Sequence, residues 1–350
     1  PPISETDDEL AYHPPTTAPK EEAIISLFYE ERVRTGKVSL NDFTFLKPAL
    51  DQKKKDKDGA TVDRDLELYD YPGLYPFPDE HEKGDSQELQ RKKDHTEAMP
   101  NMRLEALQGQ RKVGTGRSDS LRLTSGYAFT LDGYDRKELN KKPYLLLRVA
   151  HVGEKHGDLE AGAVSSRIRY HNSFTMMPKA VPYRPPRVTP KPYISGSQTA
   201  TVVGPSGDEI YTDKHRRVKI QFHWDRKGER NEKSSCWVRV SQLWAGEGWG
   251  SLFTPRINQE VIVNFLEGDP DRPIIIGRVY HATNAPTYNT PDDKTKSTIK
   301  SNSTIGGGGY NEICFEDNKG KEQIITHAQR DQNETVRRNM TTSVGNDQKT

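Results

Sequence analysis

Hydrophobic and polar side chains alternate along the segment that starts at Val218. The hydrophobic members are Val218, Ile220, Phe222 and Trp224, and the polar members are Lys219, Gln221, His223 and Asp225. Successive side chains of an extended chain point to opposite faces, so a period of two places one set in a core and the other in water. The pattern predicts a strand over 218–225, with Phe222 buried and His223 exposed.

Four similar short runs lie in the same part of the chain. They cover residues 198–203, 237–243, 261–266 and 274–280. Five short strands joined by loops, with no helix-period run longer than a turn, are typical of a small closed or nearly closed barrel. The region 197–282 is therefore predicted to be a five-stranded barrel.

The remaining segments are also predicted to be rich in strands. Strands are expected over 22–31, 37–45, 66–71, 121–131 and 144–152. The substantial helix candidate is 86–110, which Pro100 is expected to break or restart. The charge run Lys53–Gly59 alternates lysine with aspartate and is expected to be a solvated loop.

Proline-rich segments divide the chain into three regions. Pro185, Pro186, Pro190 and Pro192 indicate a stiff linker over 184–196, and the polar stretch 283–305 indicates a second one. The folded regions are then 1–183, 197–282 and 306–350. In the last of these, a hairpin with its turn at 317–320 is expected. Val336 and Val344 beyond it fit short strands that bury hydrophobic residues only against other chains.

Composition narrows the possible partners. The 52 basic residues nearly balance the 51 acidic ones, for a net charge of +1, so no charged surface for nucleic acid or membrane is indicated. Cys236 and Cys314 are too far apart for a thiolate zinc motif or a disulfide framework, and Cys236 is expected to be buried in a strand. No apolar run is long enough to span a bilayer. The chain starts at Pro1 with no apolar signal segment, and we expect it to be the middle of a longer protein.

The sequence motifs predict no catalytic, cofactor-binding or metal-binding residues. Gly306–Gly309 lacks the Lys and Ser/Thr of a phosphate loop, and Gly114-Thr-Gly116 lacks the third glycine of a dinucleotide motif, so both are expected to be turns. The histidines lack metal-ligand spacing and are expected to be exposed or satisfied by hydrogen bonds; they are His151, His156, His215, His223 and His281.

One binding alternative stays open for the barrel. An aromatic and basic face for an oligonucleotide or a cell-wall sugar would be formed by Trp237, Trp244, Trp249, Arg217, Lys219 and Arg239. In the other interpretation the tryptophans fill the barrel or a contact between subunits. Acidic side chains at Glu229, Glu232, Glu247 and Glu260 neutralise the stretch and favour that second interpretation.

An ordered set of motifs adds a family resemblance. The first group comprises Tyr69-Asp-Tyr-Pro-Gly-Leu-Tyr75, Met102-Arg-Leu-Glu105, Gly116-Arg-Ser-Asp119 and Ser125-Gly-Tyr-Ala-Phe-Thr-Leu131, and the second comprises residues 138–140, 218–225, 237–244, 248–250, 260–280 and 310–330. Together they resemble the VgrG spike proteins of bacterial type VI secretion, which are relatives of the hub and spike of contractile phage tails.

The resemblance implies a mainly β protein of several domains. Residues 1–183 would be a phage-tail-type hub β-barrel with a helix, whose N-terminal part is expected to be missing. Residues 197–282 would be an OB-fold barrel, and 306–350 the start of a C-terminal trimeric β-prism, with linkers at 184–196 and 283–305. The resemblance also implies a structural spike that punctures membranes and delivers effectors, and no enzyme. A phage-tail-type cell-wall hydrolase is the remaining alternative, although the linker at 283–301 leaves no room for a lysozyme domain.

The implied partners follow from the same resemblance. They are two further copies in a homotrimer, an Hcp-type tube protein below the hub, a PAAR-type protein at the tip, an effector or its adaptor, and baseplate proteins. No nucleic acid and no cofactor are implied, and a membrane is contacted only transiently during puncture. The protein would be cytoplasmic when assembled and then secreted or translocated into a target cell, without a signal peptide.

Overall fold

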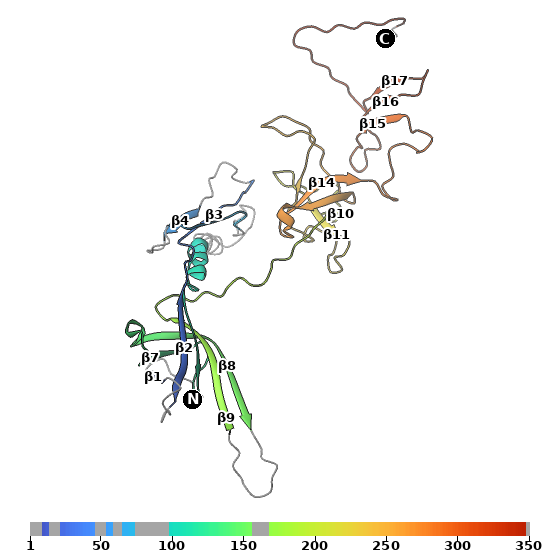
Figure 1. Cartoon of the computed structure of the whole chain (residues 1–350). Helices are drawn as coiled ribbons and strands as arrows, with labels where there is room; N and C mark the ends of the chain where they lie inside the picture. Colours follow the sequence, from blue (N-terminus) through green and yellow to red (C-terminus); the bar gives the residue numbers. More distant parts are fainter. Residues whose placement is uncertain are drawn as a thin grey trace, which may run out of the picture. The chain divides into compact units, whose positions relative to one another are not determined.

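The computed structural model describes residues 9–13, 22–45, 54–58, 65–73, 98–155 and 168–347. The chain divides into two compact units, Pro1–Val188 and Thr189–Thr350 (Figure 1). Within the described ranges strands dominate, and the α-helix covers residues 98–108. The predicted mainly β fold class is confirmed.

The first unit contains a closed six-stranded barrel. Its strands follow the order β1-β2-β6-β9-β8-β7. Their bounds are β1 Glu9–Tyr12, β2 Ala23–Glu31, β6 Lys112–Ser118, β7 Ala128–Asp132, β8 Lys142–Lys155 and β9 Ile168–Pro178. Strand β1 runs parallel to both of its neighbours, while the other pairs are antiparallel. The short 3₁₀ helix η1, Lys137–Leu139, precedes β8. The interior is aromatic, with Phe129, Tyr144 and Phe174 all buried.

The prediction of a turn at Gly114-Thr-Gly116 is wrong, because both glycines lie inside strand β6. A Cβ atom at Gly116 would stand 2.5 Å from Cζ of Phe174 and 2.7 Å from the carbonyl oxygen of Ser26. At Gly114 it would stand 2.6 Å from Cε of Met176. Glycine is therefore needed for close packing inside the barrel, where large side chains of β9 cross β6.

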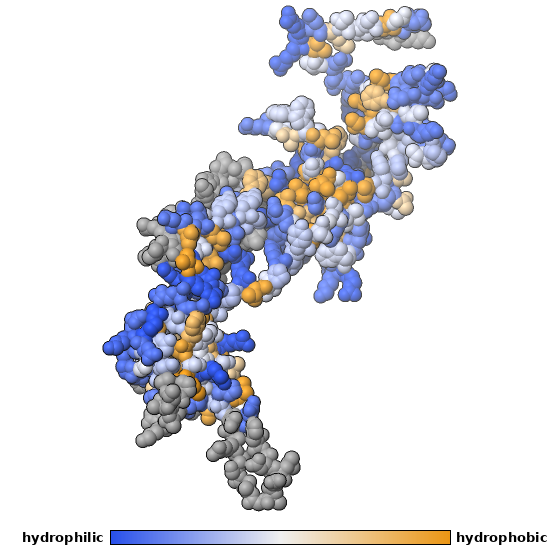
Figure 2. Space-filling view, in the orientation of Figure 1, coloured by the Kyte–Doolittle hydropathy of each residue, from blue (hydrophilic) through white to orange (hydrophobic). Residues whose placement is uncertain are grey.

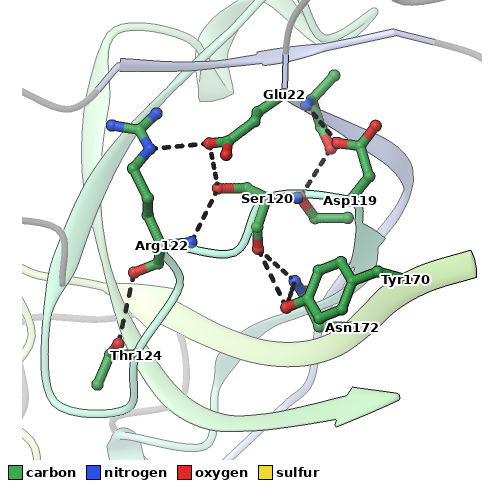
Figure 3. Close-up of polar contacts among 9 residues, drawn as sticks. Glu22, Asp119, Ser120, Arg122, Thr124, Tyr170 and Asn172 are labelled. Atoms are coloured by element: carbon green, nitrogen blue, oxygen red, sulfur yellow. Dashed lines mark hydrogen bonds and ion pairs between the residues drawn. The ribbon is translucent and has the colours of Figure 1, made fainter. Parts of the chain in front are cut away.

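A polar network joins the end of β6 to β2 and β9 (Figure 3). The backbone N–H of Ala23 donates to Asp119 Oδ1 at 2.7 Å. Glu22 Oε2 accepts hydrogen bonds from Ser120 Oγ and from Arg122 Nε, both at 2.8 Å. Asn172, fully buried on β9, donates from Nδ2 to the carbonyl oxygen of Ser120 at 2.6 Å. The bonds to Ala23 and Glu22 span 96 to 100 residues and the Asn172 bond spans 52, and together they hold the turn after β6 in one conformation.

A small sheet packs beside the helix in the same unit. It has the order β4-β3-β5, with β3 Lys37–Leu40, β4 Lys54–Asp58 and β5 Glu67–Asp70. Leu104 of the helix packs on Val38 and Leu40 of β3. One prediction is wrong at this sheet, because the charge run at 53–59 contains strand β4, whose backbone pairs with β3. Pro100 lies in the first described turn of the helix, and residues 86–97 of the predicted helix lie outside the described residues.

The second unit contains the predicted five-stranded barrel. Its order is β11-β10-β13-β14-β12, with β10 Gln198–Val203, β11 Lys219–Phe222, β12 Arg239–Val240, β13 Glu260–Phe265 and β14 Pro273–Val279. The 3₁₀ helix η2, Leu266–Gly268, joins β13 to β14. Val218 and Val238 bridge the two edge strands with backbone hydrogen bonds of 3.0 and 2.9 Å, so the barrel is nearly closed. Its interior is aliphatic, and Val202, Ile220 and Val263 are fully buried.

The prediction that one face of 218–225 is buried is only partly correct. Val218 and Ile220 are buried, but Phe222 is half-buried at the rim of the core and Trp224 is 66% exposed. The strand ends at Phe222, so Trp224 lies in the following turn and stacks on the Phe222 ring at 5.2 Å. The predicted strand over 121–131 is likewise shorter, since β7 begins at Ala128.

Candidate interaction surface

A three-stranded antiparallel sheet follows the barrel and carries the candidate surface. Its order is β15-β16-β17, with β15 Lys296–Lys300, β16 Glu312–Glu316 and β17 Gln323–His327. Ile299 pairs with Ile313, and Phe315 pairs with Ile324. Directly paired residues share one face of a sheet, so these four form one hydrophobic face. Their exposed fractions are 60% for Ile299, 45% for Ile313, 41% for Phe315 and 71% for Ile324.

The opposite face of this sheet contains buried, hydrogen-bonded polar groups. Glu312 is only 6% exposed and accepts hydrogen bonds from Thr298 Oγ1 and Tyr288 OH, each at 2.6 Å. These two bonds hold the pKa of the Glu312 carboxyl below its usual value. Lys300 Nζ stands 3.7 Å from Glu312 Oε2 and 3.7 Å from the centre of the Tyr310 ring. The sheet thus has one face with a buried, hydrogen-bonded carboxylate at Glu312 and one exposed hydrophobic face.

Arg256 helps to link the β15–β17 sheet to the barrel. Its Nη1 atom pairs with Glu209 Oε1 at 2.6 Å, and its Nη2 atom donates to the carbonyl oxygen of Asn302 at 2.7 Å. Glu209 Oε2 also accepts from the backbone N–H of Ile305 at 2.9 Å. The loop between β15 and β16 is therefore attached by two hydrogen bonds to Arg256 and Glu209, which are themselves paired.

The segment after β17 has hydrophobic residues but no strand partner within the described chain. Residues 328–347 form neither helix nor strand. Val336, Met340 and Val344 are 47%, 63% and 48% exposed. Backbone without a strand partner is open to pairing with another chain.

Sequence reasoning missed the hydrophobic face, because it assigned 283–305 to a linker and so did not include β15. The hairpin of β16 and β17 was predicted, and the alternation of Ile313 and Phe315 was visible within it. Lys296–Lys300, however, has only Ile299 as a hydrophobic residue. It becomes a strand because β16 pairs along its whole length.

The tryptophans proposed as a binding face do not form one cluster. Trp244 and Trp249 pack edge to face, with ring centroids 5.0 Å apart, and are 65% and 57% exposed. Trp237 instead stacks on Tyr211 at 5.0 Å, with Lys219 Nζ 4.8 Å from its ring centre. Trp244 and Trp249 therefore do not fill the barrel.

The remaining candidate groups have ordinary structural surroundings. His223 Nε2 lies 3.1 Å from Thr199 Oγ1, and His281 is hydrogen-bonded to Thr283 and Asn284. His156 lies outside the described residues. No group of three potential metal ligands occurs within the ranges that the structure describes.

Cys236 is exposed, contrary to expectation, because it precedes β12 in a loop, whereas Cys314 is buried. Among the same residues no helix has the length and hydrophobicity needed to cross a membrane.

Comparison with protein families gives three matches in chain order. Residues 1–157 match the phage tail baseplate hub, and 200–280 match the type VI secretion system and phage-baseplate injector OB domain. Residues 297–350 match the C-terminal trimerisation domain of bacteriophage T4 gp5. The last match contains the β15–β17 sheet except Lys296, including all four residues of the hydrophobic face. Hub, OB barrel and trimerisation domain in this order define a hub-and-spike protein of a contractile injection machine.

Curated relatives specify the family. The chain is 40% identical over 345 residues to the type VI secretion system spike protein VgrG1b of Pseudomonas aeruginosa, with 97% of this chain and 44% of the relative covered. It is 40% identical to VgrG4b and 39% identical to VgrG1a of the same organism, covering 90% and 96% of this chain and 38% and 50% of those relatives. The chain belongs to the VgrG spike family and spans half or less of the length of these three relatives.

A solved structure of an Escherichia coli component of the type VI secretion system also aligns with this chain. The alignment covers 79% of this chain and 50% of the other, with a TM-score of 0.40 and 18% identity.

Proposed function

We propose that the protein is a homotrimeric structural spike of the type VI secretion system. The observation that carries the proposal is the hydrophobic face of Ile299, Ile313, Phe315 and Ile324, which is exposed within the segment that matches a trimerisation domain. A sheet face of this kind is unfavourable in water and is covered when three copies pack together. The face supports self-association of this sheet more directly than it supports binding of a small ligand.

The proposed trimer sits on an Hcp-type tube through its hub domains and carries a PAAR-type tip protein at the spike end. An effector or its adaptor travels with it, and baseplate proteins contact it before firing. The role is mechanical: the spike crosses the target membrane during contraction and performs no catalysis. The secreted or translocated form is the same protein after the machine has fired.

Light scattering coupled to size exclusion tests the association. The full-length protein should elute with the mass of three chains, and a folded monomer at micromolar concentration would contradict the proposal. Ile313→Asp places a charge in the proposed contact and should dissociate the trimer. Lys321→Asp, in the exposed turn between β16 and β17, is the matched control and should leave the mass unchanged.

An activity assay tests the structural role separately. The purified protein should not degrade peptidoglycan, lipid or nucleic acid above a heat-inactivated control. Turnover that is lost on substitution of a residue of this chain would support the hydrolase alternative instead.

A further inference from the structure

An exposed proline-rich segment, residues 182–188, follows strand β9 and ends the first unit. Its sequence is Pro-Tyr-Arg-Pro-Pro-Arg-Val. Every residue of the segment is exposed, and Val188 reaches 80%. Among the described residues, no backbone hydrogen bond involves 182–188. In Figure 2 the connection that follows β9 is a narrow chain on which a hydrophobic group stands out. The segment therefore offers both its side chains and its backbone carbonyls to solvent.

The prolines restrict this segment to the extended polyproline II conformation. The rings of Pro182, Pro185 and Pro186 fix φ at about −65° and remove three backbone donors. The residue before a proline is also kept out of the helical region, which constrains Val181 and Arg184. The structure accordingly has neither helix, strand nor turn over 182–188. A chain that is already extended in this way loses little conformational entropy when a partner binds it.

The side chains of the segment are sorted with the three-residue period of that conformation. Residues three apart lie on the same edge of a polyproline II helix, and at about 3.1 Å per residue they are about 9 Å apart. One edge is hydrophobic and contains Pro182, Pro185 and Val188. Another edge is basic and contains Arg184 and Arg187. Stiffness alone would be enough for a spacer, whereas separate hydrophobic and basic edges are what a recognition motif needs.

Contacts within the first unit hold the start of the segment. The N–H of Val181 donates to the carbonyl oxygen of Pro178 at 3.1 Å, in the turn that leaves β9. Arg184 Nε donates to Oε2 of Glu105, on the helix 98–108, at 2.8 Å. The two arginines of the basic edge therefore differ, because Arg184 is paired within the chain while Arg187 is exposed at the end of the motif.

We propose that segment 182–188 is a docking motif for a partner protein whose groove is lined by aromatic side chains and bordered by a carboxylate. Segments with prolines at positions i and i+3 bind such grooves, because the proline rings pack between aromatic faces. Pro182 and Pro185 have this spacing, and Arg187 lies two residues beyond the second proline. A carboxylate beside the groove would pair with its guanidinium and fix the direction of binding. The inference goes beyond the proposed function and does not depend on trimerisation.

An isolated SH3 domain that is specific for PxxPxR peptides is the probe for this motif. Calorimetric titration of the full-length protein with this domain should show saturable binding. Combined replacement of Pro182 and Pro185 by Ala removes both hydrophobic anchors and should weaken binding about tenfold or more, and Arg187→Ala should do the same through the lost ion pair. Pro190→Ala is the matched control, because Pro190 is equally exposed in the same linker but lies outside the motif. It should leave the affinity unchanged.

These variants also need a test of folding. All the substituted side chains are exposed, so thermal unfolding and the mass by light scattering should match the wild type. Absence of binding by the folded wild-type protein would show that the segment is not presented as a polyproline II ligand, and would overturn the inference. Equal binding by the wild type and by the variant without Pro182 and Pro185 would overturn it as well.

Photocrosslinking in the bacteria that express the full-length protein tests for the natural partner. A benzoylphenylalanine in place of Tyr183, within the motif but off its hydrophobic edge, should give an adduct with a different protein. The adduct should disappear when Pro182 and Pro185 are replaced and persist in Pro190→Ala. The purified partner should then bind the full-length chain with the same dependence on Arg187.

The remaining outcomes contradict the inference without touching the proposed function. An adduct that forms only with another copy of this chain assigns the segment to a contact between subunits. No adduct, or an adduct that is indifferent to the two prolines, shows that the segment is a spacer. The mass of the full-length protein by light scattering tests the proposed function separately, so the failure of one proposal is distinguishable from the failure of the other.

Discussion

Lys191 donates a hydrogen bond from Nζ to Oδ2 of Asp269 at 2.6 Å, and the Asp269 side chain is only 5% exposed. The contact attaches the first residues of the second unit to the turn between η2 and β14. Two neighbours reinforce it: the N–H of Ile194 donates to the Gly268 carbonyl at 2.9 Å, and the Tyr193 ring covers Gly268, where any side chain would clash. The Asp269-Pro-Asp-Arg-Pro273 turn is therefore an anchor for the linker as well as a strand connection.

Removal of the charge at Asp269 should weaken this anchor. Asp269→Asn loses the ion pair with Lys191 from a buried position, and we expect a loss of about 1–2 kcal/mol in the free energy of unfolding of the second unit. The control is Asp271→Asn, because Asp271 also lies 3.3 Å from Lys191 but its side chain is 80% exposed. That change should stay within about 0.5 kcal/mol. Denaturant unfolding of both variants measures the difference; equal losses would show that burial at Asp269 is irrelevant.

Gly116→Ala should destabilise the first barrel. The new methyl group meets Phe174 and the backbone of β2, so we expect a loss of about 1–3 kcal/mol from overpacking. Gly153→Ala on β8 is the control, because no atom lies within 4 Å of a Cβ atom built there. Thermal unfolding should separate the two variants, and a fully stable Gly116→Ala protein would mean that β2 and β9 can move apart without loss.

The barrel strand β11 gives a test of the two faces. Phe222→Ala removes a half-buried ring that stacks on Phe265 at 5.9 Å, and we expect a loss of about 2 kcal/mol, below the value for a fully buried ring. His223→Ala, on the exposed face, should change the free energy of unfolding by no more than about 0.5 kcal/mol. Thermal shift and a secretion assay should both show the larger effect for Phe222→Ala. The reverse order would mean that the faces are assigned wrongly.

Acid should weaken the network at the end of β6. The hydrogen bond from Arg122, followed by the one from Ser120, holds the pKa of Glu22 below its ordinary value of 4.5, although burial opposes this. The ionised carboxylate then favours the folded state above about pH 4.5. This contribution is lost as the pH falls through the lower pKa of the folded protein. Between pH 6 and pH 3 the wild type should therefore lose more stability than Glu22→Gln, as measured by denaturant midpoints at each pH. Parallel curves would contradict the assignment.

The sequence alone was sufficient for the second barrel and the hairpin of β16 and β17. Alternation of hydrophobic and polar residues is a local property, and it is visible in these strands, as at Val218, Lys219 and Ile220. The family motifs extended this prediction to the hub and the trimerisation segment. Where a strand lacks that alternation, local patterns mislead. Lys54–Asp58 is charged throughout and Gly114 and Gly116 have no side chains, yet all of them lie in strands.

Tertiary structure alone decided the features that depend on distant contacts. Gly116 is in a strand because β6 pairs with β2 and β9, and glycine is needed there because Phe174, far away in the sequence, occupies the space that a side chain would need. Lys296–Lys300 becomes a strand because β16 offers its backbone for pairing. The burial of a tryptophan depends on which neighbours reach it, so Trp237 packs against Tyr211 while Trp244 and Trp249 stay exposed on a hairpin. Periodicity records which side chains can share a face, whereas only the folded chain determines whether anything covers that face.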